Sequence, residues 1–167
     1  YGGPGSESPE IWEGENDQDL DGELLLGRLK QIDPILAMQV TGARGAEVSA
    51  NPESMRHMAV SYRQCLDLII FQKLTNPEDV ANYKQILKER SDRKVALRII
   101  AGKISDDLVQ IIDLDPIHPF IHYLGRIVHG KESEINLRLL RLKAEYYIRL
   151  ILDTNQLARN LEQEKDG

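Results

Sequence analysis

The sequence lacks the features on which several classes of protein depend. It contains one cysteine, Cys65, which excludes a disulfide framework within the chain and is expected to be a small buried side chain. No apolar run approaches the ~18 residues of a membrane-spanning helix. The N-terminus has neither the basic region nor the apolar region of a signal peptide. We therefore expect an intracellular protein, cytoplasmic or nuclear rather than secreted, with no membrane partner.

Aromatic residues are scarce as well, at 5% of the 167 residues, so aliphatic side chains must supply most of the core. The chain is long enough for one domain with a sizeable core. It has no phosphate-binding loop, no G-x-S-x-G motif and no paired-cysteine site, so we expect no cofactor.

Acidic residues are concentrated near the N-terminus. The net charge is −6, but residues 7–23 hold eight Asp and Glu residues and no Lys or Arg. Without those eight negative charges, the −6 becomes about +2 for the remainder of the chain. The total charge therefore neither favours nor excludes a nucleic-acid surface on the remainder.

Residues 1–22 are rich in Gly, Ser, Pro and acidic residues, and Ile11 and Trp12 are their only large apolar pair. Such a segment buries too little apolar surface to offset the entropy of ordering it. We expect a flexible acidic tail or linker over 1–22, with Trp12 as a candidate for binding a partner. The first residues, Tyr-Gly-Gly-Pro-Gly-Ser, indicate a fragment of a larger protein.

The same acidic segment resembles the opening of a calcium-binding loop, because acidic residues alternate before Gly22. Position 12 of such a loop is Arg28, whose guanidinium cannot ligate a cation, and no helix is expected before the loop. We therefore expect no metal site in this segment.

Apolar residues recur with helical spacing along most of the remaining chain. Asn51, Asn76 and Ser91 provide start signals, and Gly102 and Gly130 provide stop signals. The predicted helices cover residues 23–40 with a break at Pro34, 51–74, 76–87, 91–102, 105–112, 119–130 and 133–164. The glycine-containing residues 41–50 predict a loop. The fold prediction is all-α, a single helical bundle of six or seven helices over 23–167 with a long C-terminal helix.

The long helix predicted over 133–164 carries two apolar stripes rather than one. The first stripe contains Ile135, Leu139, Leu142 and Tyr146, and the second contains Leu137, Leu140, Ala144, Tyr147 or Ile148, and Ile151. We expect residues 135–152 to be the centre of the bundle. Beyond Asn155 the last turns are expected to project, which makes Leu157 and Leu161 candidates for binding a partner or a second copy.

Three histidines lie close together in the sequence near the last predicted helices. His118 and His122 are four residues apart and follow Asp115, a spacing that allows a zinc site but provides no clear further ligand. Because this set is incomplete, we expect no metal there.

The run Gly125-Arg126-Ile127-Val128-His129-Gly130-Lys131, followed by a long helix, resembles the HEPN family of all-α domains. That resemblance implies an RNA-directed site formed by His122, Arg126 and His129, in which His129 acts as acid or base and Arg126 stabilises phosphate charge. The family motif is usually R-x4–6-H, whereas the spacing here is Arg126-x2-His129.

Basic residues also cluster between residues 84 and 103, where acidic residues are interspersed with them. This pattern is more typical of a solvated helix face than of a phosphate-binding stripe, so nucleic acid is not the favoured partner. The leading hypothesis is a non-enzymatic helical interaction or assembly module, a scaffold that binds a protein partner or forms a homo-oligomer. The alternative is an RNA-binding domain or HEPN-like ribonuclease.

Overall fold

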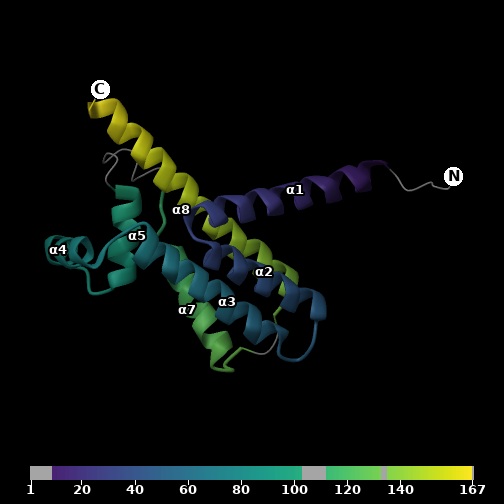
Figure 1. Cartoon of the computed structure of the whole chain (residues 1–167). Coiled ribbons are helices and arrows are strands. Elements are labelled where there is room, and N and C mark those ends of the chain that lie inside the picture. The colour runs from purple at the N-terminus through teal and green to yellow at the C-terminus, as the bar shows by residue number, and fades with distance from the viewer. Residues whose placement is uncertain (1–8, 103–111, 133–134, 167) are drawn as a thin grey trace. The chain divides into compact units, whose positions relative to one another are not determined.

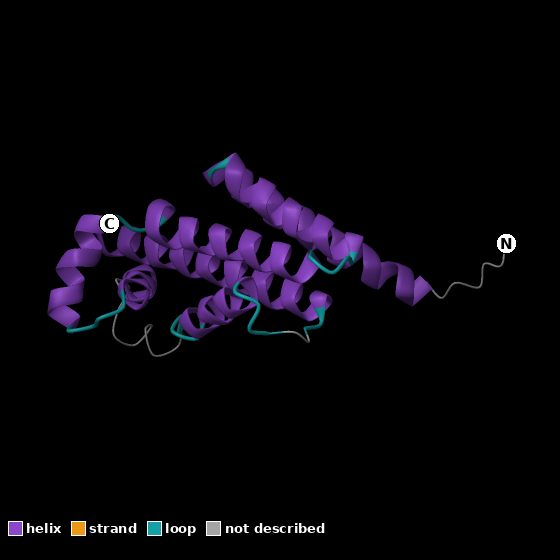
Figure 2. Ribbon diagram, turned by 90° about the horizontal axis from the view of Figure 1, so that it is seen from below, coloured by secondary structure: helices purple, strands orange, loops and turns teal. Residues whose placement is uncertain are grey.

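The structure, a computed structural model, describes the backbone of residues 9–102, 112–132 and 135–166. Within these ranges the chain forms seven α-helices and a short π-helix, and no strand (Figure 2). The all-α prediction is therefore confirmed. The chain divides into two compact units, residues 1–38 and 39–167, which we describe separately.

The first unit contains helix α1 (Pro9–Ile32) and the first turn of helix α2 (Pro34–Ser49). The predicted break at Pro34 is confirmed, since Asp33 separates the two helices and its carboxylate accepts the N–H of Ile35 at 2.9 Å. Part of α1 falls in the segment that composition predicts as a tail. The calcium-like spacing therefore lies in a helix rather than a loop. The division into a tail over 1–22 and a domain over 23–167 stays a prediction.

Helix α2 corrects the predicted loop over residues 41–50, because it continues through Gly42 and Gly45 to Ser49. Each glycine costs up to about 1 kcal/mol in a helix interior. Tertiary contacts offset that cost: Ala43 is fully buried, and Arg44 and Glu47 form ion pairs with the last helix, α8 (Leu137–Asp166).

The predicted helix over 51–74 is two elements, α3 (Ser54–Leu68) and a π-helix, η1 (Ile69–Lys73). In the π-helix the N–H of Leu74 donates to the carbonyl of Ile69 at 2.9 Å, five residues back. Asn51 is not the N-cap of α3. Its side chain accepts the N–H of Glu53 at 2.8 Å in the turn before the helix.

Helices α4 (Pro77–Leu87) and α5 (Asp92–Gly102) begin as their sequences predict. The side chain of Asn76 accepts the N–H of Asp79 at 2.8 Å, and Ser91 Oγ accepts the N–H of Lys94 at 3.2 Å. Each cap satisfies a backbone donor that the first turn would otherwise leave unpaired. The predicted helix over 105–112 lies outside the described residues, apart from Ile112.

Helix α7 (Ile117–Val128) ends at the predicted glycine. Gly130 has φ of +73°, and the N–H of Lys131 donates to the carbonyl of Arg126 at 2.9 Å. This is a Schellman cap, in which glycine adopts the left-handed conformation at little cost. Helix α8 then begins at Leu137, capped by the side chain of Asn136, which accepts the N–H of Leu139 at 3.1 Å.

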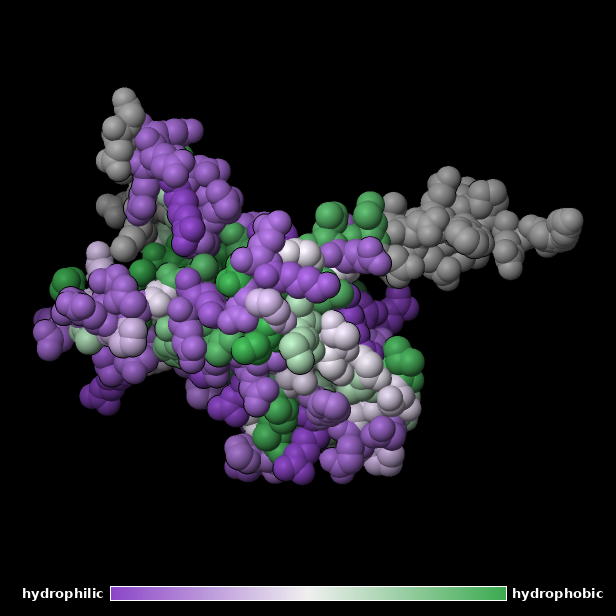
Figure 3. All heavy atoms as spheres, viewed as in Figure 1, coloured by the Kyte–Doolittle hydropathy of each residue, from purple (hydrophilic) through white to green (hydrophobic). Residues whose placement is uncertain are grey.

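In the second unit α3 packs against α7 and α8, and α5 packs against α4, the π-helix and α8 (Figure 1). The core includes the fully buried side chains of Tyr62, Leu66 and Leu124. The view in Figure 3 shows a surface that is largely hydrophilic, with separate apolar areas. None of the helices within the described ranges is long and apolar enough to cross a membrane.

Candidate functional site

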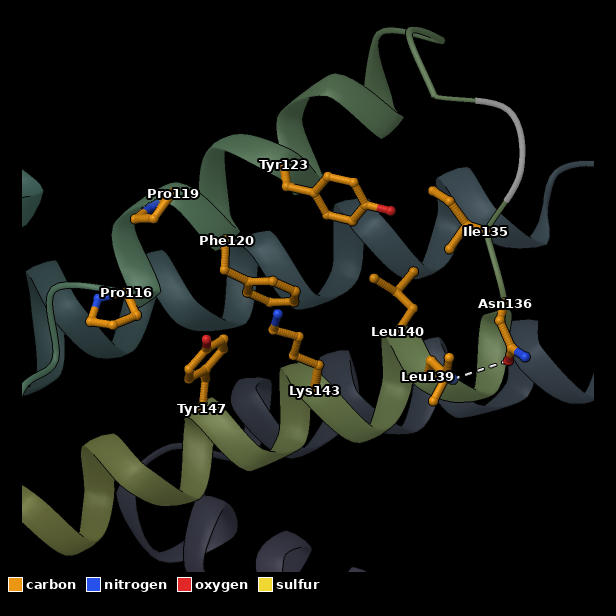
Figure 4. Close-up of a pocket in the computed structure, with 10 residues that line it drawn as sticks. All are labelled: Pro116, Pro119, Phe120, Tyr123, Ile135, Asn136, Leu139, Leu140, Lys143 and Tyr147. Atoms are coloured by element: carbon orange, nitrogen blue, oxygen red, sulfur yellow. Dashed lines mark hydrogen bonds between the residues drawn. The ribbon is translucent and has the colours of Figure 1, made fainter.

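A groove of about 570 Å³ lies between α7 and α8 (Figure 4). We call it the α7–α8 groove. Its ten lining residues are mainly apolar or aromatic: Pro116, Pro119, Phe120, Tyr123, Ile135, Asn136, Leu139, Leu140, Lys143 and Tyr147. The volume lies within the ~300–1,000 Å³ typical of ligand pockets, and an apolar lining with few polar groups is typical as well.

Helical spacing brings these side chains together. On α7, positions 119, 120 and 123 share a face, and on α8, positions 139, 140, 143 and 147 share another, with the capping residue Asn136 just before them. Figure 4 shows Phe120 directed from α7 toward α8 and Tyr123 directed toward Ile135. The ring of Phe120 lies 5.1 Å from that of Tyr147 and 6.4 Å from that of Tyr123, measured between centroids. The groove therefore has an aromatic wall.

Lys143 is the only charged residue among the ten that line the groove. Its Nζ atom lies 5.9 Å from the ring centroid of Phe120 and 5.9 Å from that of Tyr147, within the range of cation–π attraction. The Tyr147 phenol is neutral at physiological pH, and burial raises its pKa further. The charge of the groove lining is therefore positive.

The groove continues into an exposed apolar strip on α8. Leu139 is 63% exposed, Leu142 38% and Tyr146 55%. We call these three residues the α8 stripe. They belong to the first of the two predicted stripes, and the Tyr146 ring lies 5.5 Å from that of Tyr147 in the groove. Leu139 is common to the stripe and the groove, so the two form one surface.

The opposite face of α8 contains a buried ionic network that the sequence reasoning missed. Glu145 is 3% exposed and accepts hydrogen bonds from Arg44 Nε at 3.0 Å, Arg44 Nη2 at 2.6 Å and the Tyr62 hydroxyl at 2.7 Å. In the sequence, the one sign of this network is a single acidic residue among the apolar residues of the last helix. The three groups come from α2, α3 and α8, so the network links three helices of the second unit.

The electrostatics of this network favour a structural role. The hydrogen bond to Glu145 raises the pKa of Arg44, and burial together with Glu145 raises the pKa of Tyr62 well above its ordinary value. The guanidinium therefore stays charged and the phenol neutral, each paired with the same carboxylate. Burial also raises the pKa of the nearby Cys65 thiol to about 12, which keeps it protonated and unreactive. The predicted burial of Cys65 is confirmed.

The residues of the site that the HEPN resemblance implies lie at the surface, on α7 and at its C-cap. His122, Arg126 and His129 are all exposed, and none of them lines the α7–α8 groove. Arg126 Nε lies 3.1 Å from a Glu132 carboxylate oxygen, and its guanidinium lies 5.4 Å from the Tyr123 ring. A paired guanidinium is less available to a phosphate. The RNA-directed role of these three residues stays a prediction.

The histidine pair is arranged as a ring contact. The rings of His118 and His122 meet edge to face at 4.5 Å between centroids, and burial lowers the pKa of His118, with His122 as a second cause. Within the described ranges, no three His, Cys, Asp or Glu side chains are grouped so as to hold a metal ion. Asp115, His118 and His122 therefore do not form such a group.

The other partner-binding candidates are spread along the chain. Trp12 lies in α1, in a part whose side chains are outside the description. Near the end of α8, Leu157 is 37% exposed and Leu161 is half-buried, whereas Ala158 is buried. Helix α8 therefore still packs against the domain at Ala158, three residues beyond the point from which the sequence predicts that it projects.

Comparison with family models, curated proteins and solved structures finds no match for this chain. The function is therefore inferred from the groove and the α8 stripe themselves.

Proposed function

We propose that the second unit is a non-enzymatic protein–protein interaction or assembly module, and that it binds through the α7–α8 groove and the α8 stripe. The observation that carries this proposal is the exposure of Leu139, Leu142 and Tyr146 on a helix whose opposite face is part of the core. Contiguous exposed apolar side chains beside an apolar groove are typical of interaction sites.

The energetics of this surface favour association. Full burial of a large apolar side chain stabilises a complex by about 1.5–3 kcal/mol before the costs of association are subtracted. The three side chains of the stripe are 38–63% exposed, so each can add only the part of that amount that belongs to its exposed surface. The groove provides aromatic side chains, a residue type often found among binding hot spots. A partner that fills the groove also covers Leu139, so both parts contribute to one interface.

Photo-crosslinking at Leu139 tests this function. We expect a photoreactive amino acid at position 139 to crosslink to a protein, because the α8 stripe would lie within the interface. The matched control is position 86 on α4, where Ile86 is 71% exposed and lies outside the groove. Light scattering at several concentrations separates a second copy of the chain from a different protein as the crosslinked species.

The proposal fails if position 139 crosslinks no more than position 86 and the chain is a monomer at every concentration. Either a stripe-specific crosslink or a concentration-dependent oligomer that Leu139→Glu abolishes would sustain it.

The exposure of His122 and Arg126 on α7 and of His129 at its C-cap favours a second candidate, an RNA-directed reaction. A cleavage assay with single-stranded RNA tests it by comparing the chain with its His129→Ala variant. Cleavage that the variant loses supports this candidate, and the absence of cleavage by both proteins rejects the ribonuclease.

A further inference from the structure

The α8 surface around the groove is basic as well as apolar. Between residues 137 and 152, α8 contains four basic residues and one acidic residue, Glu145. Glu145 is buried and its charge is balanced by Arg44, while Arg141 is paired with Glu47. The exposed side of this part of α8 therefore presents basic side chains, Arg138 and Lys143, without an acidic one.

The described residues of α7 add no negative charge to this surface. From Pro116 to Lys131 the sequence contains no Asp or Glu. The nearest described acids on either side already have basic partners: Asp115 lies 3.5 Å from Arg98, and Glu132 lies 3.1 Å from Arg126. Lys143, over the rings of the groove, is thus a positive charge with no acidic residue of α7 beside it.

This charge pattern distinguishes a second copy from a different partner. In a symmetric dimer formed through the α8 stripe, Lys143 and Arg138 of one copy would face the same basic residues of the other, which costs free energy. A partner with carboxylates beside its apolar side chains would bury the stripe and also pair with Lys143.

The shape of the surface favours a helix as that partner. Leu139, Leu142 and Tyr146 follow one another at spacings of three and four residues, the pattern of an apolar stripe that packs along a neighbouring helix. From this we infer that the α7–α8 groove and the α8 stripe bind an acidic amphipathic helix of another protein, rather than a second copy of this chain. This inference rests on the proposed function and specifies the chemistry of the partner.

Two designed peptides test the inference against the full chain. Each has three heptads with Leu at the two core positions and one Trp in place of a central Leu. The first has Glu and Gln at the remaining positions, and the second has Lys and Gln there. Fluorescence anisotropy of the labelled peptides gives the dissociation constants. We expect the Glu peptide to bind at least about tenfold more tightly than the Lys peptide, and its affinity to fall with added salt.

Variants of the chain locate the binding surface. Lys143→Glu should weaken binding of the Glu peptide by about tenfold or more, and Leu139→Ala should weaken binding of both peptides. The matched control for the charge change is Arg90→Glu, because Arg90 is exposed in the turn between α4 and α5 and lines no part of the groove. Its affinity for the Glu peptide should stay within about twofold of that of the parent chain.

Several outcomes would overturn the inference. They are equal binding of the two peptides, binding of neither, an equal effect of Lys143→Glu and Arg90→Glu, or a dimer that Leu139→Ala dissociates. If position 139 still crosslinks to a protein or the dimer is present, the interaction function stands and only the partner's chemistry is wrong. If the crosslink and the dimer are both missing, the proposed function fails as well.

Discussion

The two faces of α8 have similar apolar content but different surroundings. On one face Ala144, Ile148 and Ile151 are fully buried, and on the other Leu139 and Tyr146 are more than half exposed. The buried face also contains the charged Glu145, whereas the exposed face contains large apolar groups. Burial therefore does not follow polarity residue by residue in this helix; it follows which face meets α3 and α5.

This comparison suggests that the two faces have different roles. The buried face stabilises the fold, so substitutions there should lower the free energy of unfolding. The exposed face contributes little to folding, so substitutions there should change association and leave stability almost unaltered.

The largest expected effect is that of Ile148→Ala on the buried face. Ile148 is 0% exposed, so its truncation leaves a cavity and should lower the free energy of unfolding by about 4 kcal/mol. Leu139→Ala, on the exposed face, should change it by less than about 0.5 kcal/mol. Urea denaturation of both variants measures the difference. Equal losses would show that both faces support the fold.

Glu145→Gln should have the next largest effect. It leaves Arg44 without the carboxylate that balances its charge, and breaking a buried pair in this way costs about 3–5 kcal/mol. We expect about 3 kcal/mol, at the lower end of that range, because the Arg44 side chain is 25% exposed. The control is Glu47→Gln, which breaks the more exposed pair with Arg141 between the same two helices. Its cost should be below about 1 kcal/mol, and a similar loss in both variants would contradict the prediction.

The smallest effect is the loss of stability between pH 8 and pH 10. The folded state raises the pKa of Cys65 from 9.0 to about 12. Above pH 9 the unfolded chain loses this proton while the folded chain keeps it, so stability should fall as pH rises from 9 toward 12. The loss from this thiol is about 1 kcal/mol per pH unit in that window. Tyr62, whose pKa is also raised, acts in the same direction at higher pH.

Denaturation curves at pH 8, 9 and 10 measure this alkaline loss. Cys65→Ala should show a smaller decrease in stability over this range than the parent chain, because the variant lacks the thiol that titrates only when unfolded. Parallel pH profiles for the two proteins would refute the assignment to Cys65.

Local signals in the sequence predicted the helix ends well where the partners are close in the chain. Asn76 and Ser91 cap helices through backbone groups three residues away, and Gly130 ends α7 through its own conformation. Asn51 misled because its side chain caps the turn before α3 rather than the helix. Asn is a suitable capping residue, but the backbone path decides whether its side chain accepts an N–H of the turn or an N–H of the helix.

Residues 41–50 show where local signals fail. Gly42 and Gly45 favour a loop by propensity, and tertiary contacts reverse that preference, among them the ion pairs with α8 about one hundred residues later in the chain. The candidate site was also only partly predictable. The sequence predicted the exposed stripe as one of two apolar stripes on the last helix. It did not predict the groove, because the groove depends on α7 and α8 lying side by side.

The sequence by itself determined that this protein is helical, where most of its described helices begin and end, and that the last helix has two apolar stripes. Periodicity and capping depend on residues within a turn or two of each other, so the sequence contains them directly. Only the tertiary structure decided which stripe is buried, that Glu145 is paired rather than solvated, and that an aromatic groove lies beside the exposed stripe. These outcomes depend on which distant helices cover each face of α8, and no local pattern specifies that choice.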